Sequence, residues 1–212
     1  MNWVDAVFAA LILTSVIIGS KKGLVREIMA FLLFFTAVIT SMNFIDDFAG
    51  WVYSKIGGSP LITAFLSFIL LLAASYAVFK LAGMAFYQVA NLKSMGKKDQ
   101  MGGALVGFLR GWLAVGALTF LVFLLPLPEK FYTAFEGSFF GPAIAKTLPL
   151  VFEGTAKIHP SNPDFMVQME KTLIEAPRQT TDGKMKEEDR QEVFRVLYQM
   201  ERFFKTVDEN KT

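Results

Sequence analysis

The chain has 212 residues, of which 53% are apolar and only 19% charged, and its 22 Phe are far above ordinary usage. The formal net charge of +2 averages two unlike parts, so it is not the footprint of a nucleic-acid partner. Residues 1–127 hold nine Lys or Arg and five acids, a net charge of +4, whereas residues 128–212 carry a net charge of −2. We expect a membrane domain followed by a solvent-exposed tail.

Four long apolar segments lie in the first part, at residues 3–18, 28–45, 61–79 and 103–127. Each is close to the roughly 20 residues that cross the hydrocarbon core of a bilayer as a helix. A soluble helix would show a polar stripe every three or four residues, and "LSFILLLAA" at 66–74 shows almost none. The sequence therefore predicts an all-α polytopic membrane protein with four transmembrane helices.

The first apolar segment has a second interpretation, as a cleaved signal peptide, because it is short. A signal peptide carries cations before its apolar region. Here "MNWVD" has an acid and no basic side chain, and the cations follow the segment. We expect a retained transmembrane helix.

The short connections predict the orientation of these helices. Connections 19–27 and 91–102 each carry three cations, whereas connection 46–60 carries Lys55 beside two acids. Cation-rich short loops stay in the cytoplasm, so both termini should be extracytoplasmic. Trp3 and Trp51 would then lie at the outer interface, where aromatic rings are favoured.

The spacing G-x-x-x-G-x-x-R occurs twice, at Gly19, Gly23 and Arg26 and again at Gly103, Gly107 and Arg110. Glycines four apart let a neighbouring helix approach closely, and each Arg would lie near that face. One interpretation is a pair of tight contacts with Arg side chains that reach the interface. The other is two parallel-repeat helix pairs, related by an axis along the membrane normal. Either way, Glu27 is the expected partner of Arg110.

The tail divides into two parts beyond the four-helix domain of residues 1–127. Residues 128–160 mix aromatic side chains with sparse charge, which suits an interfacial amphipathic segment of short helices. Residues 161–212 predict an extracytoplasmic helical tail with a linker at 176–186. Its first helix should start with Ser161 or Asn162 as cap and Pro163 in the first turn, and should place Phe165 on its apolar face.

Apolar residues recur every three or four positions in the last predicted helix, 187–205, with charges between them. This face is the candidate for partner binding, through Val193, Leu197, Met200 and Phe204. We expect it to pair with the Phe165 helix, with a second copy of the chain or with another envelope protein.

Nothing in the sequence predicts an enzyme, a metal site or a cofactor. The chain has no Cys, and its one His, His159, is expected in a solvated loop without a nucleophile or an orienting group. The acids at 46–47 and 187–189 lack the spacing of a calcium loop. We therefore expect no catalytic residues.

Three sequence elements, "NWVD", "GSKKGLVRE" and "DQMGGALVGFLRGWL", resemble the colicin V production protein family over roughly residues 1–125. Lys22 and Gln100 depart from that family's pattern, which has Arg at both positions. The matching residues are Asn2, Asp5, Gly19, Gly23, Arg26, Glu27, Asp99, Gly103, Gly107, Arg110 and Gly111.

The resemblance implies a bacterial inner-membrane protein involved in colicin V production and envelope stress tolerance. In some relatives the same helices precede an extracytoplasmic protease domain, which agrees with an outside C-terminus. We expect a non-enzymatic membrane scaffold, with the lipid bilayer and other envelope proteins or further copies as partners. The alternative is a small oligomeric channel or transporter lined by the Gly and Arg faces.

Overall fold

The computed structural model describes residues 2–89, 96–159, 164–180 and 185–205. Within these residues all of the regular secondary structure is helical, with no strand. Four helices are long and apolar enough to cross a membrane, as predicted: α1 (Trp3–Lys22), α2 (Leu24–Asn43), α4 (Pro60–Val89) and α5 (Lys97–Phe123).

The ends of these helices differ from the apolar segments in the sequence. α1 continues to Lys22, and α5 begins at Lys97, well before Gly103, so that Arg110 lies deeper along its helix than the apolar run suggested. Composition marks the part of a helix that needs hydrocarbon around it, whereas the helix itself continues into polar residues at the interface.

α1 and α2 are separated by a single residue, Gly23, whose φ of 81° is in the left-handed region that favours glycine. α1 itself begins with a capping box. The Asn2 side chain accepts from the Val4 and Asp5 N–H groups, and the Asp5 side chain accepts from the Asn2 N–H. A cap at one end and a glycine break at the other therefore fix the limits of α1.

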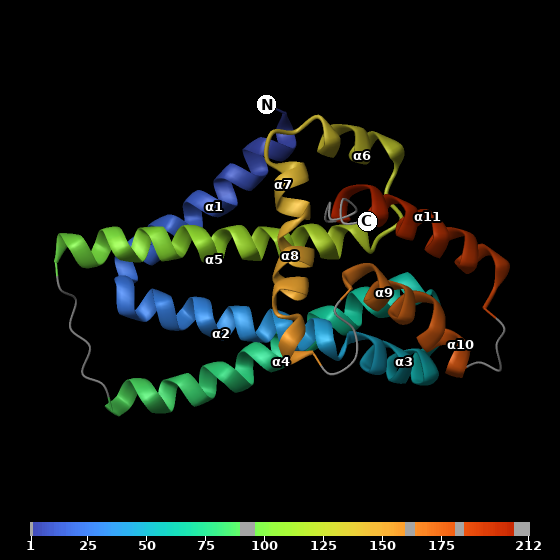
Figure 1. Ribbon diagram of the computed structural model, residues 1–212, viewed down its shortest axis with the longest axis horizontal. Helices are drawn as coiled ribbons and strands as arrows, with labels where there is room; N and C mark the ends of the chain where they lie inside the picture. The colour runs from blue at the N-terminus through green and yellow to red at the C-terminus, as the bar shows by residue number, and fades with distance from the viewer. Residues whose placement is uncertain (1, 90–95, 160–163, 181–184, 206–212) are drawn as a thin grey trace.

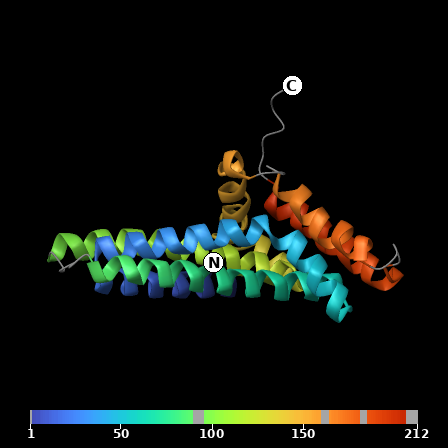
Figure 2. The same cartoon turned by 90° about the horizontal axis from the view of Figure 1, so that it is seen from below.

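The long helices lie side by side; of the tail helices, α6, α9, α10 and α11 lie toward one end of the group, while α7 and α8 cross α5 before its end (Figure 1, Figure 2). α1 packs against α5, α2 packs against both α5 and α4, and α1 and α5 run in opposite directions. Asn2 and Phe204 both lie at the tail end, through contacts with Ala134 and Phe123. The cations Lys22, Lys97 and Lys98 lie toward the opposite end.

The connection at 46–60 contains a helix that the sequence interpretation missed, α3 (Ile45–Ile56). It is amphipathic, with Ala49, Val52 and Tyr53 buried and Trp51 exposed and stacked on Phe48. Two acids in its first turn stabilise the helix, because negative charge interacts favourably with the positive end of the helix dipole.

The tail folds as short helices packed on the membrane domain. Residues 128–160 contain α6 (Glu129–Glu136), α7 (Gly141–Ala145), α8 (Thr147–Gly154) and a 3₁₀ turn (Ala156–Ile158). Then come α9 (Phe165–Glu170), a π-helical turn (Lys171–Glu175), α10 (Ala176–Thr180) and α11 (Glu187–Phe204).

Two local predictions in the tail are wrong. The cap of α9 is Asp164, whose side chain accepts from the Met166 and Val167 N–H groups; Ser161, Asn162 and Pro163 lie outside the described residues. The first five residues of the expected linker are helix α10. The wider π-helical turn before Pro177 accommodates a residue that lacks an N–H and would crowd the carbonyl one turn back.

An aromatic cluster joins the tail to the end of α5. The Phe123 ring lies 5.0 Å from the rings of Phe135 and Phe204 and 5.4 Å from Tyr132. Edge-to-face pairs of this kind add about 0.5–1.5 kcal/mol each beyond the burial of their area. The tail is therefore part of the same core as the membrane helices.

This packing corrects the predicted partner-binding face of the last helix. Val193, Met200 and Phe204 are at most 1% exposed, and Leu197 packs against the same core. Of the three expected arrangements, the structure shows the one within the chain, because Phe204 stacks on Phe165 of α9 with ring centroids 5.8 Å apart. This face of α11 is buried because α11 and α9 both pack against the end of α5.

Candidate functional site

The two glycine pairs of the repeated spacing contact each other, across the junction of α1 and α5. A methyl group built on Gly107 would lie 2.7 Å from the Ser15 carbonyl oxygen and 3.1 Å from the Gly19 Cα. One built on Gly103 would lie 2.8 Å from the Gly23 carbonyl carbon. Only glycine allows backbones to approach this closely. The interpretation as tight helix contacts is therefore correct for these four glycines.

Gly111 extends the same contact by one turn, since a methyl group there would lie 2.7 Å from the Ser15 Cβ. The two glycine pairs have different local structures, however. Gly23 separates two helices, whereas Gly103 and Gly107 lie inside one. The shared spacing therefore does not support a repeat, and an axis that relates the two helix pairs stays a prediction.

Asp99 caps α2 from another helix. Its Oδ1 accepts from the Leu24 N–H at 2.9 Å, and its Oδ2 occupies the space that a side chain on Gly23 would need. Gly23 has no side chain to cap α2 itself. A carboxylate in this position accepts from an N–H that has no partner within α2, and its negative charge interacts favourably with the positive end of the helix dipole.

Glu27, Arg110 and Lys22 form a charge cluster where α1, α2 and α5 meet. The Arg110 Nε lies 3.0 Å from the Glu27 Oε1, and the Lys22 Nζ lies 3.9 Å from Oε2. The Glu27 side chain is fully buried and that of Arg110 is 16% exposed. The predicted pairing of Glu27 with Arg110 is thus present.

Ser15 completes this cluster, because its hydroxyl accepts from the Arg110 Nη2 at 3.4 Å. The sequence interpretation did not single out Ser15. The signal that could have found it is position: Ser15 lies one turn before Gly19, on the face of α1 that meets α5. Arg26, the corresponding Arg of the first spacing, is exposed.

Asn2 and Asp5 form a second polar cluster, at the other end of α1. Asp5 is fully buried, and its Oδ1 accepts from the backbone N–H groups of Phe139 at 2.8 Å and Phe140 at 3.0 Å. The Asn2 side-chain amide donates to the Ala134 carbonyl. These two residues therefore cap α1 and anchor the segment between α6 and α7.

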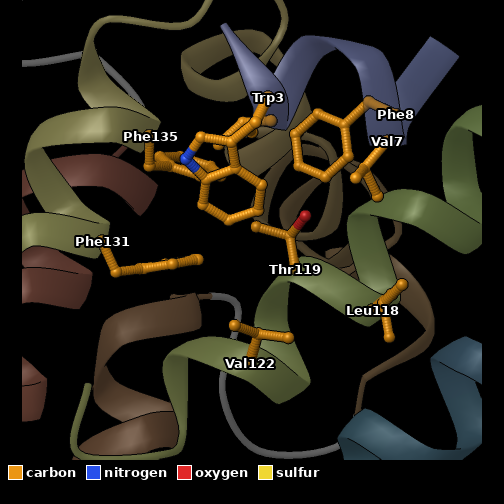
Figure 3. A pocket seen from close by; sticks show the side chains of 9 residues that line it. Trp3, Val7, Phe8, Leu118, Thr119, Val122, Phe131 and Phe135 are labelled. Carbon is orange, nitrogen blue, oxygen red and sulfur yellow. The ribbon is translucent and has the colours of Figure 1, made fainter. Parts of the chain in front are cut away.

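An apolar pocket of about 120 Å³ lies next to this anchor, between α1, α5 and α6 (Figure 3). Trp3 and Phe8 line it from α1, and Phe135 lines it from α6. Thr119 of α5 also lines the pocket, and its buried hydroxyl has no hydrogen-bond partner within the described part of the chain. The pocket is too small and too apolar to suggest a reaction.

His159 is not the solvated loop residue that the sequence predicted. Its Nδ1 contacts the Asn43 side-chain oxygen, and its Nε2 lies 2.9 Å from the Phe152 carbonyl oxygen and 2.8 Å from the Thr155 hydroxyl. The side chain therefore ties the end of α8 to the end of α2. Among the described residues, no group of three or more His, Asp or Glu has the arrangement of a metal site.

Four apolar helices, three of them joined by a close glycine contact and a buried ion pair, define an all-helical multi-pass membrane protein. The chain belongs to the colicin V production protein family, whose model matches residues 4–149. The match extends past residue 125, where the resemblance seen in the sequence ended, through α6 and α7 and into α8. No curated protein and no solved structure matches the chain.

Proposed function

We propose that this protein is a non-enzymatic scaffold of the bacterial inner membrane that supports colicin V production or export and envelope homeostasis. Family membership and the four apolar helices support the membrane setting and the link to colicin V. The main support for the scaffold role is the packing of the tail on the end of α5. The packed tail helices form a platform that can hold partners at a fixed place.

The outer face of this platform supplies a surface for such partners. Tyr198 and Phe194 of α11 are 66% and 49% exposed. Aromatic residues of this kind dominate binding at protein interfaces. The partner surface is therefore the face of α11 opposite to the one that the sequence indicated.

The proposed orientation places this platform outside the cytoplasm, with both termini extracytoplasmic. Its support is the charge of the short connections, because Lys22 and Lys97 lie at the end of the bundle opposite to the platform. Exposed apolar side chains along α1 and α4 suit lipid and the surface of a second copy, so we include a homo-oligomer in the proposal.

In-cell crosslinking from a photoreactive residue at Tyr198 tests the scaffold, with the buried Met200 as the matched control on the same helix. A defined envelope protein or a second copy captured from Tyr198 and not from Met200 is the expected result. The Tyr198→Glu variant should then lower colicin V secretion, whereas Gln191→Glu, an exposed position on α11, should not. Normal secretion by the Tyr198→Glu variant at normal protein level would contradict the proposal.

A small oligomeric channel or transporter is the second candidate, and the buried Glu27–Arg110 pair favours it. Charges within membrane helices commonly mark ion pathways. Ion flux into liposomes that contain the wild-type chain or the Glu27→Gln/Arg110→Gln variant, which removes both charges together and leaves no unpaired buried carboxylate, separates the two functions. A scaffold gives the same low flux for both proteins, whereas a pore lined by Arg110 changes its selectivity.

A further inference from the structure

A groove of about 560 Å³ lies between α1, α2, α4 and α5, the four membrane-spanning helices. This volume is within the roughly 300–1,000 Å³ of ordinary ligand pockets. Its walls are mostly apolar, with Leu11 and Ile18 from α1, Phe34 from α2 and Ile69 from α4. A surface of this kind, among helices that cross a bilayer, suits a hydrocarbon chain.

One end of the groove is cationic. Arg110 lies in the wall itself. Lys22 follows the lining residue Ile18 by one helical turn of α1, and Lys80 follows the lining residue Tyr76 by one turn of α4. The Lys80 ammonium lies 6.0 Å from the Tyr76 ring centroid, which places it at that end.

Among the described residues, the carboxylate that forms ion pairs within this group of three cations is that of Glu27, so the cations outnumber their acidic partner. Arg110 and Lys22 share one carboxylate, that of Glu27, at 3.0 and 3.9 Å. Arg110 uses its Nε on Glu27 and Nη2 on Ser15, so the five donors of its guanidinium are not all used by these partners. Anionic lipid phosphates bind basic sites of this kind between transmembrane helices.

We propose that the groove binds one anionic phospholipid, with an acyl chain between α1 and α4 and its phosphate at Lys22, Lys80 and Arg110. The apolar walls select a hydrocarbon chain, and the excess of positive charge selects an anionic headgroup over a zwitterionic one. The site goes beyond the proposed scaffold, because it depends only on the membrane helices.

Titration of the purified full chain with phosphatidylglycerol and with phosphatidylcholine of the same acyl chains, followed by native mass spectrometry, tests the proposal. The wild type should prefer phosphatidylglycerol. The variant Lys22→Gln/Lys80→Gln should bind it about 25-fold more weakly, at about five-fold for each Lys near an anionic headgroup. Arg110 is left unchanged, because its loss would leave Glu27 buried without its closest partner.

Two matched controls separate this site from general charge and surface effects. Lys55→Gln/Lys130→Gln removes the same charge from exposed positions on α3 and α6 and should keep the preference. Ala73→Phe fills the groove and should weaken both lipids, whereas Ala74→Phe, next to it but outside the lining, should weaken neither.

Three results would overturn the proposal. The first is equal binding of the two lipids by the wild type. The second is an unchanged preference in Lys22→Gln/Lys80→Gln or unchanged binding in Ala73→Phe, with normal helix content. The third is efficient crosslinking of Ala73 to a second copy in the membrane, because a protein helix would then occupy the groove.

Discussion

Replacing Arg110 with Gln leaves the Glu27 carboxylate buried without its closest partner. The Glu27 side chain is fully buried, and its remaining ion-pair partner among the described residues is Lys22, at 3.9 Å from Oε2 and itself 45% exposed. Removing one member of a buried ion pair costs about 3–5 kcal/mol, and replacing both members often costs little. We expect Arg110→Gln to lower the free energy of unfolding by about 3 kcal/mol, because Lys22 compensates in part for the lost charge. The double variant Glu27→Gln/Arg110→Gln should lower it much less.

Unfolding of the purified chain in mixed detergent micelles, followed by circular dichroism, measures these differences. The cycle consists of the wild type, both single variants and the double variant, since only a cycle isolates the interaction of the pair. A loss below about 1 kcal/mol in Arg110→Gln would refute the buried pair. So would a double variant that is less stable than Arg110→Gln.

Three further predictions concern the rest of the structure. Gly107→Val should separate α1 from α5 and lower stability in the same assay, whereas Gly154→Ala, with no atom near the added methyl group, should not. Asp5→Asn weakens the acceptor of two N–H groups before α7, so hydrogen exchange should speed up there and not in α11. Burial raises the pKa of Tyr132 above its ordinary value near 10; stability should therefore be complete below pH ~10 and fall as pH rises above it, and Tyr132→Phe should reduce that fall.

The membrane helices were predictable because each contains enough apolar residues to cross a bilayer, and this pattern needs no knowledge of contacts. The pairing of Glu27 with Arg110 was predictable for a related reason. A charge in an apolar helix needs a partner, and the sequence offers few at the same depth. The start of α5 was not predictable from hydropathy, because its first residues are Lys97, Lys98 and Asp99.

Contacts between distant parts of the chain were beyond the sequence. The Asp5 carboxylate is held by N–H groups of Phe139 and Phe140, and no local pattern indicates backbone donors so far along the chain. The apolar face of α11 was visible as a pattern, but a pattern shows that a face needs cover and not what covers it. α3 was missed because its acids and glycine within twelve residues are typical of a loop.

The repeated spacing has one physical explanation even though its two copies differ in local structure. Gly107 brings the backbone of α5 against Gly19 of α1, and α2 begins immediately after α1, at Leu24. α2 is therefore carried to the same side of α5, where Arg110 meets Glu27 at 3.0 Å. The close glycine contact is what makes a short, buried ion pair geometrically possible, so the Gly and Arg of the spacing act together on α5. In the first copy, Gly19 and Gly23 make the close contact with α5, but Arg26 is exposed. Identical spacing therefore does not imply identical roles.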